Sequence, residues 1–125
     1  MSRRLEGKRV LVVDDDPDIL DAVDEVLRSE GADTRLVDNG NEAVTAMGDE
    51  PFALVVLDMM LPGRSGFLVL EKIKGREDSP PVIMLTANEG KRHQAYAENL
   101  GVDRYFQKPV PLARLLDAAV ELTAG

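Results

Sequence analysis

Five runs of apolar residues alternate along the chain with segments in which apolar residues recur at helical spacing. The runs cover residues 9–13, 34–37, 52–57, 81–85 and 103–106. The first, third and fourth runs are continuous, which is typical of strands that are covered on both faces of a sheet. The second run is more polar and contains Arg35, so it predicts a weaker strand.

The segments between these runs predict five helices. Asp16 can cap the first helix, Pro17 suits its first turn, and Gly31 can end it. Asn39, with a glutamate three residues later, has the pattern of a capping box before the second helix. The second helix is expected to run through Met47. The third is expected to span 67–73, the fourth to span about 89–100, and the fifth to begin at Pro111.

A strand and a helix therefore alternate five times. Connections of this length join parallel strands through right-handed crossovers. Buried first, third and fourth strands beside a more polar second strand indicate an open, doubly wound α/β sheet with helices on both faces. We expect the flavodoxin-like strand order 2-1-3-4-5 in one domain over residues 1–125, with a core from about 8 to 122.

Composition narrows the classes of function. The chain has 125 residues, of which 44% are hydrophobic and 30% charged, as is typical of a globular domain. No apolar run approaches the length of about 18 residues that predicts a membrane span. Arg3 and Arg4 lack the apolar segment that follows in a signal peptide, so a cytoplasmic location is expected. The absence of cysteine excludes disulfides, thiolate metal sites and cysteine nucleophiles.

The chain is acidic, and its acidic residues are concentrated after the first strand. A net charge of −8 argues against direct binding of nucleic acid, which needs clustered Lys and Arg. In an open parallel sheet, ligands bind beyond the carboxyl ends of the strands where the strand order reverses, here between strands one and three. Asp14 and Asp15 follow the first strand and Asp58 follows the third, so three carboxylates should meet there. We assign Asp16 to helix capping instead.

These residues predict a metal-assisted reaction with phosphate. Three carboxylates in one crevice repel one another, and a divalent cation removes the conflict. Oxygen ligands select a hard ion, so Mg²⁺ is expected, with Mn²⁺ as a substitute. Thr86 ends strand four and Lys108 lies just beyond strand five, where a hydroxyl and an ammonium group could clamp a phosphate. Asp58 is ionised at neutral pH and could form an aspartyl phosphate.

Four short segments carry a resemblance to a known family. They are 12–15 (Val-Val-Asp-Asp), 57–63 (Leu-Asp-Met-Met-Leu-Pro-Gly), 85–87 (Leu-Thr-Ala) and 108–109 (Lys-Pro). Each segment alone is a weak signal, but the ordered set is highly specific. Together they resemble the receiver domains of two-component response regulators, in particular the single-domain, chemotaxis-regulator-like members, over about residues 8–122.

The resemblance implies a role for each site residue. Asp58 would be the phosphoacceptor, supplied by a sensor histidine kinase or a histidine phosphotransfer protein. Asp15, Asp58 and the backbone carbonyl of Met60 would bind Mg²⁺ directly, and Asp14 would act mostly through water. Thr86 and Lys108 would bind the phosphoryl oxygens. The chain would catalyse only its own phosphorylation and dephosphorylation and would not be an enzyme acting on a separate substrate.

The resemblance also implies a switch. Thr86 would move toward the phosphate, Tyr105 would change rotamer, and the face of the fourth helix, fifth strand and fifth helix would then bind a downstream protein. The bond between Lys108 and Pro109 would be cis. We interpret the lone His93, in a polar helix, as an exposed surface residue rather than a phosphotransfer group.

Three other functions compete with this one. A flavodoxin shares the fold, but the acidic loop that begins at Asp14 would repel a flavin phosphate. An aspartate-nucleophile phosphatase would use the spacing of Asp14 and Asp16, but Pro17 and the short chain fit that class poorly. A receiver-like binding module without phosphorylation would not need the full set of acids, threonine and lysine. Whether the domain stands alone or comes from a larger regulator or hybrid kinase is left open.

Overall fold

Five parallel strands form a single sheet in the order β2-β1-β3-β4-β5. The computed structural model describes residues 3–87 and 91–124. The strands are β1 (Arg9–Val13), β2 (Asp33–Val37), β3 (Leu54–Asp58), β4 (Val82–Thr86) and β5 (Arg104–Gln107). All four neighbouring pairs are parallel, so the predicted doubly wound sheet and its strand order are confirmed.

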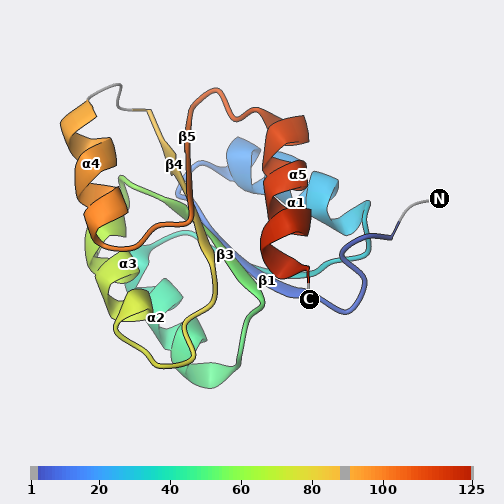
Figure 1. Cartoon of the computed structure of the whole chain (residues 1–125), viewed down its shortest axis with the longest axis horizontal. Coiled ribbons are helices and arrows are strands. Elements are labelled where there is room, and N and C mark those ends of the chain that lie inside the picture. The colour runs from blue at the N-terminus through green and yellow to red at the C-terminus, as the bar shows by residue number, and fades with distance from the viewer. Residues whose placement is uncertain (1–2, 88–90, 125) are drawn as a thin grey trace.

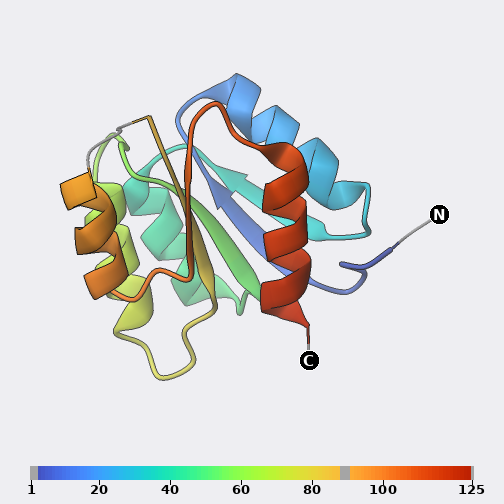
Figure 2. The ribbon, with the colours of Figure 1, turned by 45° about the horizontal axis from the view of Figure 1, so that its top comes forward.

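Helices cover both faces of this sheet. They are α1 (Pro17–Arg28), α2 (Gly40–Asp49), α3 (Gly66–Lys74), α4 (Lys91–Asn99) and α5 (Leu112–Thr123). Figures 1 and 2 show α1 and α5 on one face and α2, α3 and α4 on the other. Positions 89 and 90, where the fourth helix was expected to start, lie outside the described residues. None of the described helices is long and apolar enough to cross a bilayer.

The two layers of helices explain the continuous apolar strands. Side chains of β1 alternate between two separate clusters of buried residues, with Leu11 and Val13 in one and Val10 and Val12 in the other. All residues of β3 and β4 are buried. A strand covered on both faces needs apolar side chains at every position, since a side chain on either side meets a helix.

The helix ends follow local chemistry. The carboxylate of Asp16 accepts the N–H of Asp18 at 2.9 Å, and the amide oxygen of Asn39 accepts the N–H of Glu42 at 2.9 Å. After α1 the chain turns at Gly31, whose φ of 93° lies in the left-handed region. These caps begin α1 and α2 directly after the turns that leave β1 and β2.

Candidate functional site

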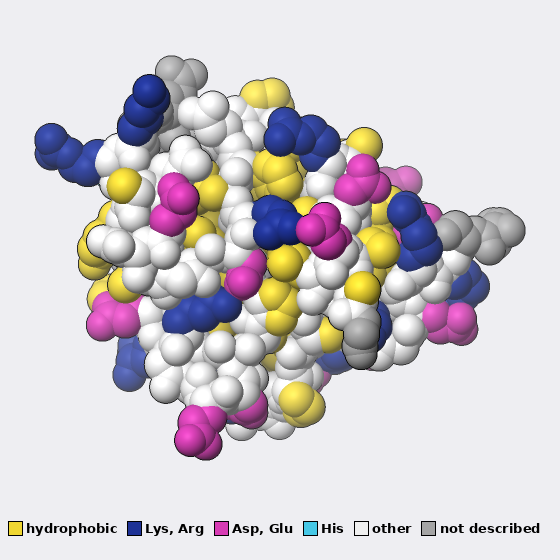
Figure 3. Space-filling view, in the orientation of Figure 1, with side chains coloured by type: hydrophobic (Ala, Val, Ile, Leu, Met, Phe, Trp, Pro, Cys, Tyr) yellow, Lys and Arg dark blue, Asp and Glu magenta, His cyan; other side chains and the backbone are white. Residues whose placement is uncertain are grey.

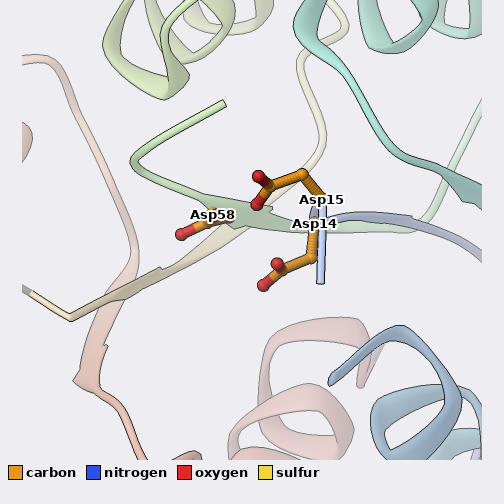
Figure 4. A group of neighbouring side chains, drawn as sticks. All are labelled: Asp14, Asp15 and Asp58. Carbon is orange, nitrogen blue, oxygen red and sulfur yellow. The ribbon is translucent and has the colours of Figure 1, made fainter. Parts of the chain in front are cut away.

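The carboxyl ends of β1 and β3 bring three acids together. Val13 pairs with Leu57 in the sheet, so the residues that follow at the two strand ends are neighbours in space. Asp58 is the last residue of β3, and Asp14 follows β1. Oxygens of Asp14, Asp15 and Asp58 all lie within 4.8 Å of one another. Figure 4 shows the three carboxylates extending to the same side of the strand ends.

The three acids differ in their exposure. Asp14 is fully buried and Asp58 is 2% exposed, whereas Asp15 is exposed. One oxygen of Asp14, Oδ1, accepts the N–H of Asp16 at 2.9 Å. This bond fixes the Asp14 side chain, and the cluster opens to solvent on the side of Asp15.

Lys108 compensates the two buried acids. Its Nζ lies 3.1 Å from Oδ2 of Asp14 and 3.2 Å from Oδ1 of Asp58. The backbone N–H of Lys108 donates to the carbonyl of Thr86 at 2.7 Å, and the peptide bond to Pro109 is cis. Buried charges are tolerated when they are paired, so Lys108 makes the burial of both carboxylates tolerable.

The ion pair with Lys108 does not fully offset the effect of burial on the pKa of Asp58. Burial raises the pKa of Asp58 to about 6, and the nearby carboxylate of Asp14 acts in the same direction. Lys108 and the backbone N–H of Met60 act the other way. Burial lowers the pKa of Lys108, but Asp14 and Asp58 outweigh it, so the net shift is upward and the ammonium stays charged.

Thr86 and Tyr105 both contact the side chain of Met59. Thr86 is fully buried at the end of β4, and its hydroxyl donates to Sδ of Met59 at 3.6 Å. The hydroxyl of Tyr105 lies 4.0 Å from the same sulfur atom. Met59 is 2% exposed and directly follows Asp58. The structure therefore links the two predicted switch residues through Met59, to which the sequence analysis assigned no role.

The donor set fits a hard divalent cation. Within residues 3–87 and 91–124, Asp14, Asp15 and Asp58 form a group of acids with metal-ligand spacing. Three ionised carboxylates and one ammonium leave two negative charges at the site. Carboxylate oxygens with an open, solvated side match the preference of Mg²⁺ for oxygen ligands and retained water. The cluster could therefore hold such an ion.

The prediction that the side chain of His93 is exposed is wrong. Its side chain is half-buried, and its ring lies parallel to the ring of Phe67 with 6.1 Å between the centroids. Tyr96 packs edge-on against the same ring at 4.9 Å. The sequence placed His93 in a polar helix, but the packing of α4 against α3 covers one side of that helix.

Gly66 was not predicted to affect the site. A Cβ at this first residue of α3 would lie 2.3 Å from the carbonyl oxygen of Asp58 and 2.7 Å from Cα of Met59. Glycine therefore lets α3 begin directly against the backbone that carries Asp58. The available signal is a glycine directly before the helix that was expected over 67–73.

Fold and site together define a doubly wound α/β protein with an acidic site at the switch point of its sheet. The family model for the response regulator receiver domain matches residues 10–120, and the chain belongs to this family. It is thus a receiver domain of two-component signalling, as the sequence motifs indicated.

Individual relatives agree with this assignment. The chain is 38% identical over 102 residues to the DNA-binding response regulator MtrA of Mycolicibacterium smegmatis, covering 82% of this chain and 44% of MtrA. The chain thus spans less than half the length of that relative. The receiver domain of the Francisella response regulator 1452 superimposes with a TM-score of 0.88 at 26% identity, covering 94% and 97% of the two chains. The receiver domain of the sensor histidine kinase PA1611 of Pseudomonas aeruginosa, which has a magnesium ion in its active-site cleft, gives a TM-score of 0.85 at 26% identity, covering 95% and 99%.

Proposed function

We propose that this receiver domain accepts a phosphoryl group on Asp58 in a reaction that depends on Mg²⁺. The observation that supports it most is the position of Asp58 at the switch point, with an oxygen 3.2 Å from Lys108 and with Asp14 and Asp15 alongside. The relative with magnesium in its cleft has the same fold.

The donor in this proposal is a histidine kinase or a histidine phosphotransfer protein. An oxygen of Asp58 attacks phosphorus, the O–P bond forms, the P–N bond to the donor histidine breaks, and the electron pair returns to the imidazole nitrogen. Lys108 stabilises negative charge on the transferred group, and the hydroxyl of Thr86 donates to one of its oxygens. We expect the donor to dock at a groove of about 260 Å³ next to the Lys108–Pro109 peptide bond. The groove is lined by Asp18 and three apolar residues of α1 and by Pro109, Val110 and Leu112.

The cation would be held by Asp15, Asp58 and the backbone carbonyl of Met60, with Asp14 acting through water. When bound, it offsets charge on the phosphoryl group and on the acids that surround it. Among the described residues, Lys108 is the cationic side chain that pairs with Asp14 and Asp58. The protein turns over only its own aspartyl phosphate and has no separate substrate.

The readout of the phosphate begins at Met59. When the hydroxyl of Thr86 turns from the Met59 sulfur to a phosphoryl oxygen, the space beside Met59 changes and Tyr105 can move inward. The face of α4, β5 and α5 then alters and binds a downstream protein. Figure 3 shows hydrophobic side chains among charged ones on this side of the molecule. On this face Arg104 of β5 pairs with Glu121 of α5 at 2.7 Å.

Acetyl phosphate provides the direct test. With Mg²⁺ present, intact mass should show one added phosphoryl group on the wild type and none on Asp58→Asn, while the exposed control Asp18→Asn should behave as the wild type. Chelation of the cation with EDTA should abolish the reaction. Equal labelling of Asp58→Asn would show that another residue is the acceptor, and multiple turnover of a phosphate ester would favour a phosphatase instead.

A further inference from the structure

The segment 59–65, which joins β3 to α3, lies against the first turn of α2. The N–H of Gly40 donates to the carbonyl of Pro62 at 3.2 Å. Nε of Arg64 donates to Oδ1 of Asn41 at 3.2 Å. The start of α2 thus holds the middle of this segment through one backbone and one side-chain hydrogen bond.

Gly40 allows an approach that no other residue could make. A Cβ at this position would lie 2.1 Å from the carbonyl oxygen of Arg64 and 2.8 Å from its carbonyl carbon. The φ of Gly40 is outside the left-handed region, so the close contact rather than the backbone conformation requires glycine. Because the atoms in contact are backbone atoms and the Cβ of Arg64, whose positions the backbone fixes, no rotamer change can relieve the overlap. Any larger residue must displace segment 59–65 or α2.

The segment is fixed on its other side as well. The N–H of Met59 donates to the carbonyl of Leu85 at 2.9 Å, and the N–H of Gly66 donates to the carbonyl of Met59 at 2.9 Å. The backbone N–H of Met60 faces the Asp58 carboxylate and lowers its pKa. Met60 therefore lies on the short stretch between a fixed end at Met59 and the contact of Gly40 with Arg64, so a displacement at Arg64 acts on it through the backbone of three intervening residues.

We infer that Gly40 is a positioning residue for the cation site. It lets the first turn of α2 hold segment 59–65 so that the backbone of Met60 stays beside the carboxylates. The inference rests on the proposed binding of Mg²⁺ and extends it to a residue that does not touch the ion. Residues that orient the ligands of a metal commonly affect its affinity by about tenfold or more.

Two alanine substitutions in the same helix test the inference. Gly40→Ala places its Cβ against Arg64, whereas Gly48→Ala meets no atom within 4 Å and serves as the control. Mg²⁺ is titrated into ¹⁵N-labelled protein at constant ionic strength, and Kd is taken from amide shifts. Kd should rise about tenfold for Gly40→Ala and stay unchanged for Gly48→Ala. An unchanged Kd for Gly40→Ala would overturn the inference.

Asn41→Ala gives a second test that adds no atoms to the structure. It removes the hydrogen bond to Arg64 at an exposed position, so the protein should fold even where Gly40→Ala does not. Kd for Mg²⁺ should rise about twofold to threefold, as expected for the loss of one hydrogen bond. If Gly40→Ala does not fold and Asn41→Ala binds with the wild-type Kd, the inference is wrong.

Amide hydrogen exchange tests the contact without the ion. In metal-free Gly40→Ala, the amides of residues 40 and 64 should exchange faster than in the wild type, while those of β4 should not change. Unchanged exchange at both positions would contradict a displacement of the segment. Should the wild type itself show no saturable response to Mg²⁺, the proposed function fails and takes the inference with it; when only the variants match the wild type, the inference alone fails.

Discussion

Lys108 is the residue on which the charge balance of the site depends. Its ammonium group bridges Asp14 and Asp58, both of which are almost completely buried. Leaving a buried charge without its partner costs several kcal/mol, about 3–5 in measured cases. Burial, together with repulsion from the carboxylate of Asp14, outweighs the attraction of this one ammonium group, so the pKa of Asp58 stays raised at about 6.

Asp58→Asn should therefore stabilise the metal-free protein at neutral pH. Because the pKa of Asp58 rises from 3.8 to about 6 on folding, protonation of Asp58 favours the folded state. That stabilisation is fully present below about pH 4 and is lost as the pH rises through 6. Asparagine mimics the neutral carboxyl, so the variant should be more stable than the wild type by up to about 3 kcal/mol above pH 6. Urea unfolding in EDTA measures the difference.

The dependence on pH separates charge from packing. The gain in unfolding free energy should shrink as the pH falls toward 4 and vanish well below it, where Asp58 is protonated in both the folded and the unfolded state. Asp18→Asn, on the exposed side of α1, should show no comparable gain at any pH. A gain for Asp58→Asn that is the same at pH 4 and pH 8 would contradict the electrostatic explanation.

At the scale of elements, the carboxylate of Asp103 joins three of them. Its Oδ2 accepts the N–H of Val82 at 2.8 Å and pairs with Nζ of Lys74 at 2.7 Å. Lys74 is the last residue of α3, Val82 is the first of β4, and β5 begins just after Asp103. One partly buried side chain therefore fixes the end of a helix relative to the starts of two strands.

Asp103→Ala should destabilise the fold by about 1–3 kcal/mol, because it removes the acceptor of the Val82 N–H and the charge partner of Lys74, whose ammonium group keeps the carbonyl of Pro80. The matched control is Asp78→Ala, which breaks an ion pair with Arg76 at 3.4 Å whose carboxylate side is 75% exposed. Asp78→Ala should lower the unfolding free energy by less than about 0.5 kcal/mol. Urea unfolding of both variants gives the comparison. Equal losses would show that Asp103 acts only as a surface charge.

The interiors of the strands could be predicted from the sequence, and their ends could not. Residues 52–57 were predicted as the third strand, whereas β3 is Leu54–Asp58. Burial on both faces determines which residues are apolar, and it leaves a continuous apolar run that is visible in the sequence. Pairing with the neighbouring strand determines where a strand ends, and Asp58 belongs to β3 because it pairs with Leu85. That partner is distant in the sequence, so no local pattern could reveal it.

At the scale of the whole molecule, topology explains why the acids could be predicted to meet. Once β1 and β3 are adjacent and parallel, the residues that leave them share one edge of the sheet. The sequence could not show that Asp14 is fully buried while the adjacent Asp15 is exposed. Nor could it show that Met59 lies between Thr86 and Tyr105. Both depend on how loops and helices pack around the edge, which is a tertiary property.

The net charge of −8 provides a last prediction for the whole chain. Mutual repulsion disfavours the compact state, so any cation stabilises the fold somewhat by screening. A specifically bound ion adds RT ln(1 + [Mg²⁺]/Kd), about 2.7 kcal/mol at a concentration of 100 Kd. Mg²⁺ added at constant ionic strength should therefore raise the unfolding free energy of the wild type in proportion to ln[Mg²⁺] above Kd.

Substitution of two exposed acidic residues distinguishes specific binding of Mg²⁺ from screening of the net charge. Asp15→Asn removes a carboxylate of the cluster and should lose most of the stabilisation by Mg²⁺, while Asp21→Asn removes the same charge from the outer surface of α1 and should retain it. The stabilisation of both variants is measured by thermal or urea unfolding at increasing Mg²⁺ concentration, with NaCl adjusted to keep the ionic strength constant. Because the two variants have equal net charge, screening would affect them alike. An equal response in both variants would therefore mean that Mg²⁺ stabilises the protein through its overall charge and not through the site at the ends of β1 and β3.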